Sequence, residues 1–246
     1  MKNPIANNRK FAAVLGAITL ALMLIGVALR IINLYCNFEM ETGYYYSSAP
    51  LPDIMHVFFA LSVLTLGILS FVMAKKMSLE AIELKKDPTA NVVLCFLAIA
   101  ALIYIVAKSY FDILFALNSP NKILLHMACL AAMFFFLTLA RLNLEVLKEK
   151  SYLFFISTTV FLCGVYAIPS MFFCVISPIY KEYTYFYFDI AIFAVFVFAA
   201  IKLIALVLTK KPQSPVEPIA EIENISDETD NISENNDTTP ANTEEE

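Results

Sequence analysis

Charged residues are scarce in this chain: they make up 16% of its 246 residues, while 60% are hydrophobic. The mean hydropathy is accordingly high, at +0.72. A soluble domain of this length needs a polar surface, and so few charges cannot supply one. The shortage of charge therefore excludes an ordinary soluble globular protein and indicates an integral membrane protein.

Glycine, tryptophan and recognisable catalytic motifs are also scarce or missing. With five glycines, loops that cradle phosphates are not expected, and the chain contains no HExxH, GxSxG, P-loop or GxGxxG pattern. The five cysteines show no CxxC or Cys/His spacing. The apolar runs also lack the paired glutamates of intramembrane hydrolases. No set of residues therefore argues for an enzyme.

Six long apolar runs account for most of the sequence. About 20 apolar residues in a helix cross a hydrocarbon core of roughly 30 Å, and continuous runs favour helices over the alternating strands of a barrel. We therefore expect an all-α, polytopic fold, with residues 1-211 forming a six-helix transmembrane domain. The expected spans lie near residues 11-35, 54-74, 91-115, 122-144, 152-176 and 185-209.

Lysine and arginine fall on alternate sides of these spans. One side receives Lys122 and Lys181, whereas the other receives Lys2, Arg9, Lys10, Lys75, Lys76, Lys85, Lys86, Arg141, Lys148, Lys150, Lys210 and Lys211. Basic residues near span ends concentrate on the cytoplasmic side. The sequence therefore predicts cytoplasmic N- and C-termini in a bacterial cytoplasmic membrane. The paired lysines mark topology, and no basic cluster indicates nucleic-acid binding.

Residues 212-246 differ from the rest in composition. They are rich in Pro, Asn, Thr, Ser and Glu and contain no basic residue. Such a segment cannot bury enough apolar surface to fold, so we expect a disordered acidic cytoplasmic tail. The tail either keeps the chain solvated or binds a cytoplasmic protein partner.

Ionisable residues recur at similar depth near the external ends of the spans. They form a candidate polar vestibule: Arg30, Asp53, His56, Lys108, Asp112, His126 and Asp189. Charged groups within spans are costly and tend to face the bundle interior, paired or hydrated. The alternative is structural pairing and snorkelling of the longer side chains to the interface. Asp189 is the strongest candidate because a short carboxylate cannot snorkel far, and a salt bridge to Arg30 or Lys108 would satisfy it.

Two further features have alternative interpretations. His56 and His126 are the only histidines and could ligate a haem, although interfacial histidine is common. Small residues recur every fourth position in the first span, in the sets Ala12 and Gly16, and Ala13, Ala17 and Ala21. Such stripes allow close helix approach, either within the bundle or against a membrane partner.

The stretch from Arg30 to Tyr45 resembles an uncharacterised group of six-helix membrane proteins from Gram-positive anaerobes. In that group an Arg ends the first helix, and Asp-Pro-x-Thr-Gly-aromatic follows in the first external loop. This chain has Glu39-Met40-Glu41-Thr42-Gly43-Tyr44 there, which keeps Thr-Gly-aromatic but not Asp-Pro. The resemblance implies no activity. The six helices with an Ala-rich first helix also look like the substrate-binding subunits of energy-coupling vitamin transporters, which implies a ligand site reached from outside.

Three hypotheses for function follow from the sequence. The first is a non-enzymatic scaffold or regulatory membrane protein that acts through residues 212-246. The second is a transport or ligand-binding membrane subunit that uses the outward-facing polar vestibule. The third is a haem-bearing membrane redox protein.

Overall fold

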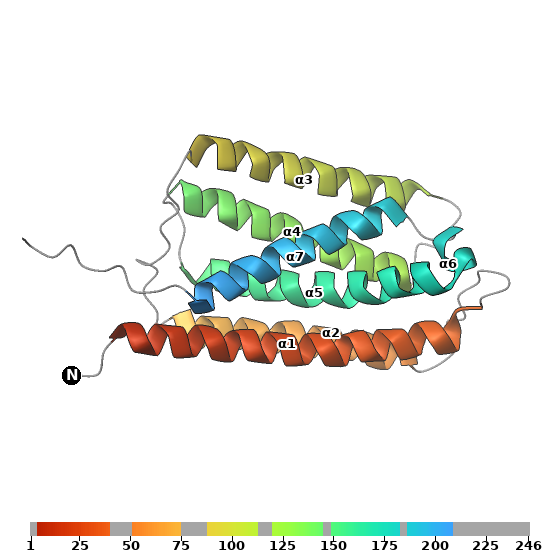
Figure 1. Cartoon of the computed structure of the whole chain (residues 1–246), viewed down its shortest axis with the longest axis horizontal. Helices are drawn as coiled ribbons and strands as arrows, with labels where there is room; N and C mark the ends of the chain where they lie inside the picture. Colours follow the sequence, from red (N-terminus) through yellow and green to blue (C-terminus); the bar gives the residue numbers. More distant parts are fainter. Residues whose placement is uncertain are drawn as a thin grey trace, which may run out of the picture. The chain divides into compact units, whose positions relative to one another are not determined.

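The computed structural model of the chain describes residues 4–39, 51–74, 88–112, 120–144, 149–182 and 186–208 (Figure 1). All of them belong to one unit, Met1–Lys211; the predicted tail 212-246 lies outside the described residues. Their secondary structure is helical: α1 (Pro4–Asn37), α2 (Leu51–Ala74), α3 (Pro88–Phe111), α4 (Pro120–Asn143), α5 (Glu149–Ile176), α6 (Pro178–Glu182) and α7 (Phe186–Leu208).

Six of these helices are long and apolar enough to cross a membrane: α1 to α5 and α7. The predictions of an all-helical fold and of six membrane-spanning helices are therefore confirmed. Each predicted span overlaps one of these helices. The remaining helix, α6, has five residues and follows α5 after a single residue.

The six long helices run alternately up and down, so the bundle has two distinct ends (Figure 1). We call the end at which α1 begins and α7 finishes the proximal end. The distal end is the one at which α1 finishes, α7 begins and α6 lies. These names make no reference to the sides of a membrane.

Helix α5 forms the centre of the bundle. It packs against α1, α2, α4 and α7, and 72% of its apolar stretch is buried, against 17% for α3. Its buried hydroxyls differ in their hydrogen bonding. The Thr159 hydroxyl donates to the Ala131 carbonyl of α4 at 2.9 Å, whereas those of Ser157 and Thr158 are buried without a hydrogen-bond partner. Helix α3 lies at the periphery and packs mainly against α4, so most of its side chains are left for lipid.

Two glycines allow α1 and α5 to approach each other. A Cβ atom on Gly26 of α1 would lie 2.7 Å from Cγ2 of Val165, and one on Gly164 of α5 would meet Met23 of α1. The two contacts are reciprocal, so the interface is built around the small residues.

The small-residue stripe predicted on the first span lies nearer the start of α1 than Gly26. Ala12 is buried and Gly16 is half-buried, whereas Ala13, Ala17 and Ala21 are exposed. The exposed set faces away from the bundle, and the idea that it contacts a membrane partner stays a prediction.

Candidate functional site

The largest fully buried side chain in the described part of the chain is that of Arg30. It lies on α1 about two turns before the distal end of that helix, with 0% of its surface exposed. Its Nη2 donates to Oδ1 of Asn121, at the start of α4, over 2.8 Å. The guanidinium carbon is 5.4 Å from the ring centre of Tyr166, within the range of a cation–π contact.

Tyr166 links this cation to a buried carboxylate. The Tyr166 hydroxyl donates to Oδ1 of Asp189 at 2.6 Å, and the Cys174 thiol lies 3.8 Å from Oδ2 of the same group. Asp189 is on the first turn of α7 and is completely buried. Side chains of α1, α5 and α7 therefore meet in one polar cluster, in which a positive and a negative group offset each other's charge.

Two asparagines of α1 extend the polar surface toward the distal end. Asn33 and Asn37 are one turn apart and both are buried; the Asn37 side-chain amide donates to Oδ1 of Asn33. The Asn33 amide in turn lies 3.5 Å from the Met55 sulfur of α2. The buried face of α1 thus carries three polar residues in its last two turns, Arg30, Asn33 and Asn37, beside the buried Leu34.

An aromatic layer covers the cluster at the distal end. The Tyr180 ring of α6 packs against Phe38 at 5.1 Å and against Phe173 at 5.6 Å between ring centres. Leu34 and Cys174 complete this buried group. We call it the distal cap, and it separates Arg30 and Asp189 from the end of the bundle.

The short helix α6 is positioned by local chemistry. Ser177 precedes Pro178, and its hydroxyl accepts a hydrogen bond from the Tyr180 backbone N–H at 3.2 Å. A serine N-cap followed by proline at the first helical position is a strong helix start. The start of α6 directs the Tyr180 side chain inward, where its hydroxyl reaches Ser170 at 3.5 Å. Burial raises the pKa of Tyr180 to about 12, and nearby Arg30 opposes that increase.

The guanidinium of Arg30 is incompletely satisfied. Its Nε and Nη1 are buried and have no hydrogen-bond partner. A buried donor left unpaired costs about 1–3 kcal/mol, and more when the group is charged. Nearly all buried polar groups in native proteins have a partner, so these two donors require a physical explanation.

The other predicted residues lie apart from this cluster. Asp53 and Lys108 are exposed, and Asp112 is half-buried. His126 is half-buried on α4, and its Nε2 is 2.7 Å from the Ser109 hydroxyl of α3. His56 is half-buried on α2, with a buried Nε2 that has no hydrogen-bond partner. Of the seven residues predicted for the vestibule, Arg30 and Asp189 are the two that share the buried cluster.

The cluster also contains residues that sequence reasoning did not single out. Asn121 and Tyr166 contact the charged groups directly, and Tyr180 is close enough to feel both charges. All three are uncharged residues of common types, which carry little signal in the sequence. The only available signal for Tyr166 is its depth, ten residues before the end of α5, where an interfacial tyrosine would not be expected.

The described residues contain no group of three or more His, Cys, Asp and Glu side chains that could hold a metal ion. The five cysteines are free thiols. Haem ligation by His56 and His126 stays a prediction from the sequence. In the structure, His126 contacts the Ser109 hydroxyl, whereas Nε2 of His56 is buried without a hydrogen-bond partner.

Comparison of the chain with models of protein families, with curated proteins and with solved structures finds no match. The fold therefore defines a class, a multi-pass helical membrane protein, and function has to be argued from the cluster itself.

Proposed function

We propose that this protein is a ligand-binding or transport subunit of a bacterial cytoplasmic membrane, and that Arg30 binds the carboxylate of a small ligand. The observation that carries the proposal is the pair of unpartnered donors on a fully buried guanidinium. An ionisable residue inside a membrane protein is by default a functional-site hypothesis. The chemistry of the free donors narrows that hypothesis to an anion.

The choice of a carboxylate follows from the geometry of arginine. A guanidinium presents its donors in a planar fork that matches the two oxygens of a carboxylate. Nη2 donates one of its two hydrogens to Asn121, which fixes the plane of the group. Its second hydrogen can still form a fork with either Nε or Nη1, both of which lack a partner. A lysine at this position would offer a point charge without that directional match.

A purely structural role explains the cluster less well. Asp189 is a carboxylate of the protein itself, and it accepts its 2.6 Å hydrogen bond from Tyr166. Arg30 contacts the same tyrosine through the ring face. Tyr166 thus occupies a position between the charges, and it leaves the free donors of Arg30 for another acceptor.

Access to this site requires movement of the distal cap. Tyr180, Phe38 and Phe173 are buried, and a ligand that reaches Arg30 from the distal end would have to displace them. We propose that α6, which has five residues and begins directly after Ser177, is the part of the cap that moves. Closure over a bound anion would exclude water and strengthen the charge–charge contact.

The proposed direction of access rests on topology. The excess of lysine and arginine near the proximal ends of the spans supports cytoplasmic termini. The distal cap then faces the outside of the cell, and the ligand arrives from there.

Thermal unfolding with a thiol-reactive dye tests the proposal. Four cysteines are buried and become reactive on unfolding, and Cys36 is exposed, so Cys36→Ser gives a low background. Acetate, glycine and inorganic phosphate serve as probes. We expect a carboxylate probe to raise the Tm, since binding to the folded state stabilises it.

Two variants make that test specific. Arg30→Gln should abolish the increase in Tm, whereas Lys108→Gln, a change of an exposed cation at the same end of the bundle, should preserve it. Equal responses of the wild type and Arg30→Gln to every probe would refute the proposal.

The scaffold hypothesis depends on residues 212-246, which lie outside the described residues. Deletion of that segment should leave the carboxylate response intact if the two functions are separate. The haem hypothesis retains its own test, a Soret band that disappears in His56→Ala.

A further inference from the structure

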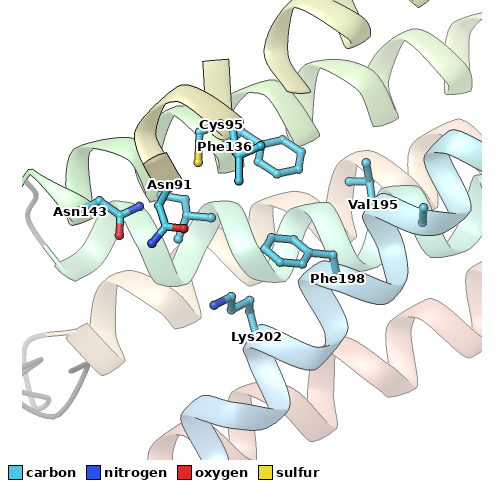
Figure 2. A pocket seen from close by; sticks show the side chains of 10 residues that line it. Asn91, Cys95, Phe136, Asn143, Val195, Phe198 and Lys202 are labelled. Carbon is cyan, nitrogen blue, oxygen red and sulfur yellow. The ribbon is translucent and has the colours of Figure 1, made fainter. Parts of the chain in front are cut away.

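A cavity lies toward the end of the bundle opposite Arg30. It is a crevice of about 420 Å³ between α3, α4 and α7. Most of its lining is apolar, with Leu94 from α3, Phe136 and Leu139 from α4, and Val195 from α7 (Figure 2). We call it the proximal crevice.

Three polar side chains gather at one end of the proximal crevice (Figure 2): Asn91, Asn143 and Lys202. Asn91 is in the first turn of α3 and Asn143 is the last residue of α4. Lys202 lies six residues before the end of α7, or about 9 Å along the axis. The polar end of the crevice therefore lies at its proximal side, and its apolar part extends toward the middle of the bundle.

Lys202 is the cation of this site. It is half-buried, and its ammonium lies 5.5 Å from the centre of the Phe198 ring. Within the described residues it has no ion-pair or hydrogen-bond partner. A cation–π contact contributes about 0.5–2 kcal/mol, which is less than the cost of an ammonium held inside a span. An anion beside Lys202 would supply the missing stabilisation.

The crevice arises because α3 and α7 diverge. Near the distal end Tyr104 of α3 packs edge-on against Phe188 of α7 at 6.4 Å. Toward the proximal end α7 crosses away from α3 and approaches α1 (Figure 1). The space between α3 and α7 is thus wedge-shaped, with α4 as its floor and its wide end at the proximal side.

We propose that the proximal crevice binds an anionic phospholipid, with the phosphate on Lys202 and one acyl chain along the apolar walls. The shape favours an amphiphile, because a polar end with one cation continues directly into an apolar slot. The position of the crevice also favours an anionic phospholipid. Basic residues cluster near the proximal ends of the spans, as expected for the cytoplasmic leaflet, which carries the anionic lipids. A soluble anion would leave the apolar part of the crevice unfilled.

Native mass spectrometry of the full-length protein in detergent tests this proposal. Phosphatidylglycerol and phosphatidylcholine of identical acyl chains are the probes, and the Kd of the first bound lipid is compared. We expect phosphatidylglycerol to bind at least fivefold more tightly. Lys202→Gln should remove the difference, Lys202→Arg should retain it, and Lys108→Gln, at the other end of the bundle, should leave it unchanged.

Equal binding of the two lipids by the wild type, or an unchanged preference in Lys202→Gln, would overturn the proposal. Displacement of phosphatidylglycerol by soluble glycerol phosphate would also contradict it, because it would show that the crevice takes the free anion. If Lys202→Gln fails to fold, Lys202→Met tests the same charge with the apolar part of the side chain retained. These residues are separate from Arg30, so failure here leaves the proposed function untouched.

Discussion

Arg30 and Asp189 are joined through one tyrosine: the Arg30 guanidinium lies 5.4 Å from the centre of the Tyr166 ring, and the hydroxyl of that ring donates to Asp189 at 2.6 Å. The three residues come from α1, α5 and α7. Two buried charges are therefore held near each other while the guanidinium keeps two donors free. The salt bridge between Arg30 and Asp189 that the sequence suggested stays a prediction.

Removal of the Tyr166 hydroxyl should destabilise the protein through Asp189. In Tyr166→Phe the buried carboxylate loses its short hydrogen bond, and a double-mutant cycle with Asp189→Asn should give a coupling energy of about 1–2 kcal/mol. Thermal or denaturant unfolding in detergent provides the measurement. The matched cycle of Asp189→Asn with Lys108→Gln should give a coupling energy near zero, because Lys108 is exposed. Similar coupling in both cycles would mean that the effect is not specific to Tyr166.

The free energy of unfolding should fall between pH 10 and pH 12 because of Tyr180. Burial raises the pKa of Tyr180 from 10 to about 12, so the folded state holds this proton more tightly than the unfolded state does. The contribution of this protonated hydroxyl to the free energy of unfolding is fully present below pH 10 and is lost as the pH rises through 12. A pKa shift of this size corresponds to roughly 2–3 kcal/mol. Tyr180→Phe has no proton to lose at this site. Its unfolding free energy should fall less over the same pH range, and an identical fall would contradict the account of the distal cap.

Gly26→Ala should destabilise the bundle more than Gly67→Ala. A methyl group on Gly26 would meet the stiff β-branched side chain of Val165 at 2.7 Å, whereas one on Gly67 would lie 3.3 Å from a Phe154 ring carbon. We expect a loss of about 1–3 kcal/mol for Gly26→Ala from overpacking. Gly67→Ala should be close to neutral, because the gain in helix propensity offsets the milder contact. Comparison of the Tm values of the two variants tests the prediction, and equal values would argue against close packing of α1 on α5.

The sequence predicted the spans well because span length is dictated by the thickness of the bilayer. The span expected near residues 152-176 corresponds to Ser151–Ile176, and that near 122-144 to Asn121–Asn143. Rotation of each helix about its axis is set by packing and leaves little trace in composition. For that reason the sequence placed Lys108 and Asp189 in the same candidate vestibule, although one is exposed and the other completely buried.

The partners of Arg30 could not be predicted for a related reason. Asn121 comes from α4 and Tyr166 from α5, and both lie far from Arg30 along the chain. Their proximity depends on α5 being the central helix, which follows from the three-dimensional packing. Helix α6 was also missed, since a helix of five residues is too short to give a periodic signal.

The most direct test of the central claim uses the arginine side chains themselves. The chain has three arginines, Arg9, Arg30 and Arg141, so protein labelled with ¹⁵N-arginine gives at most three Nε–H resonances, and Arg30→Lys assigns the relevant one. Titration with the carboxylate probe that raises the Tm should shift the Arg30 Nε–H signal saturably and slow its exchange with water, while the Arg9 and Arg141 signals stay in place. An Arg30 signal that remains unchanged at saturating probe, or that shifts no more than the signal of Arg141, would contradict the assignment of Arg30 as the anion-binding residue.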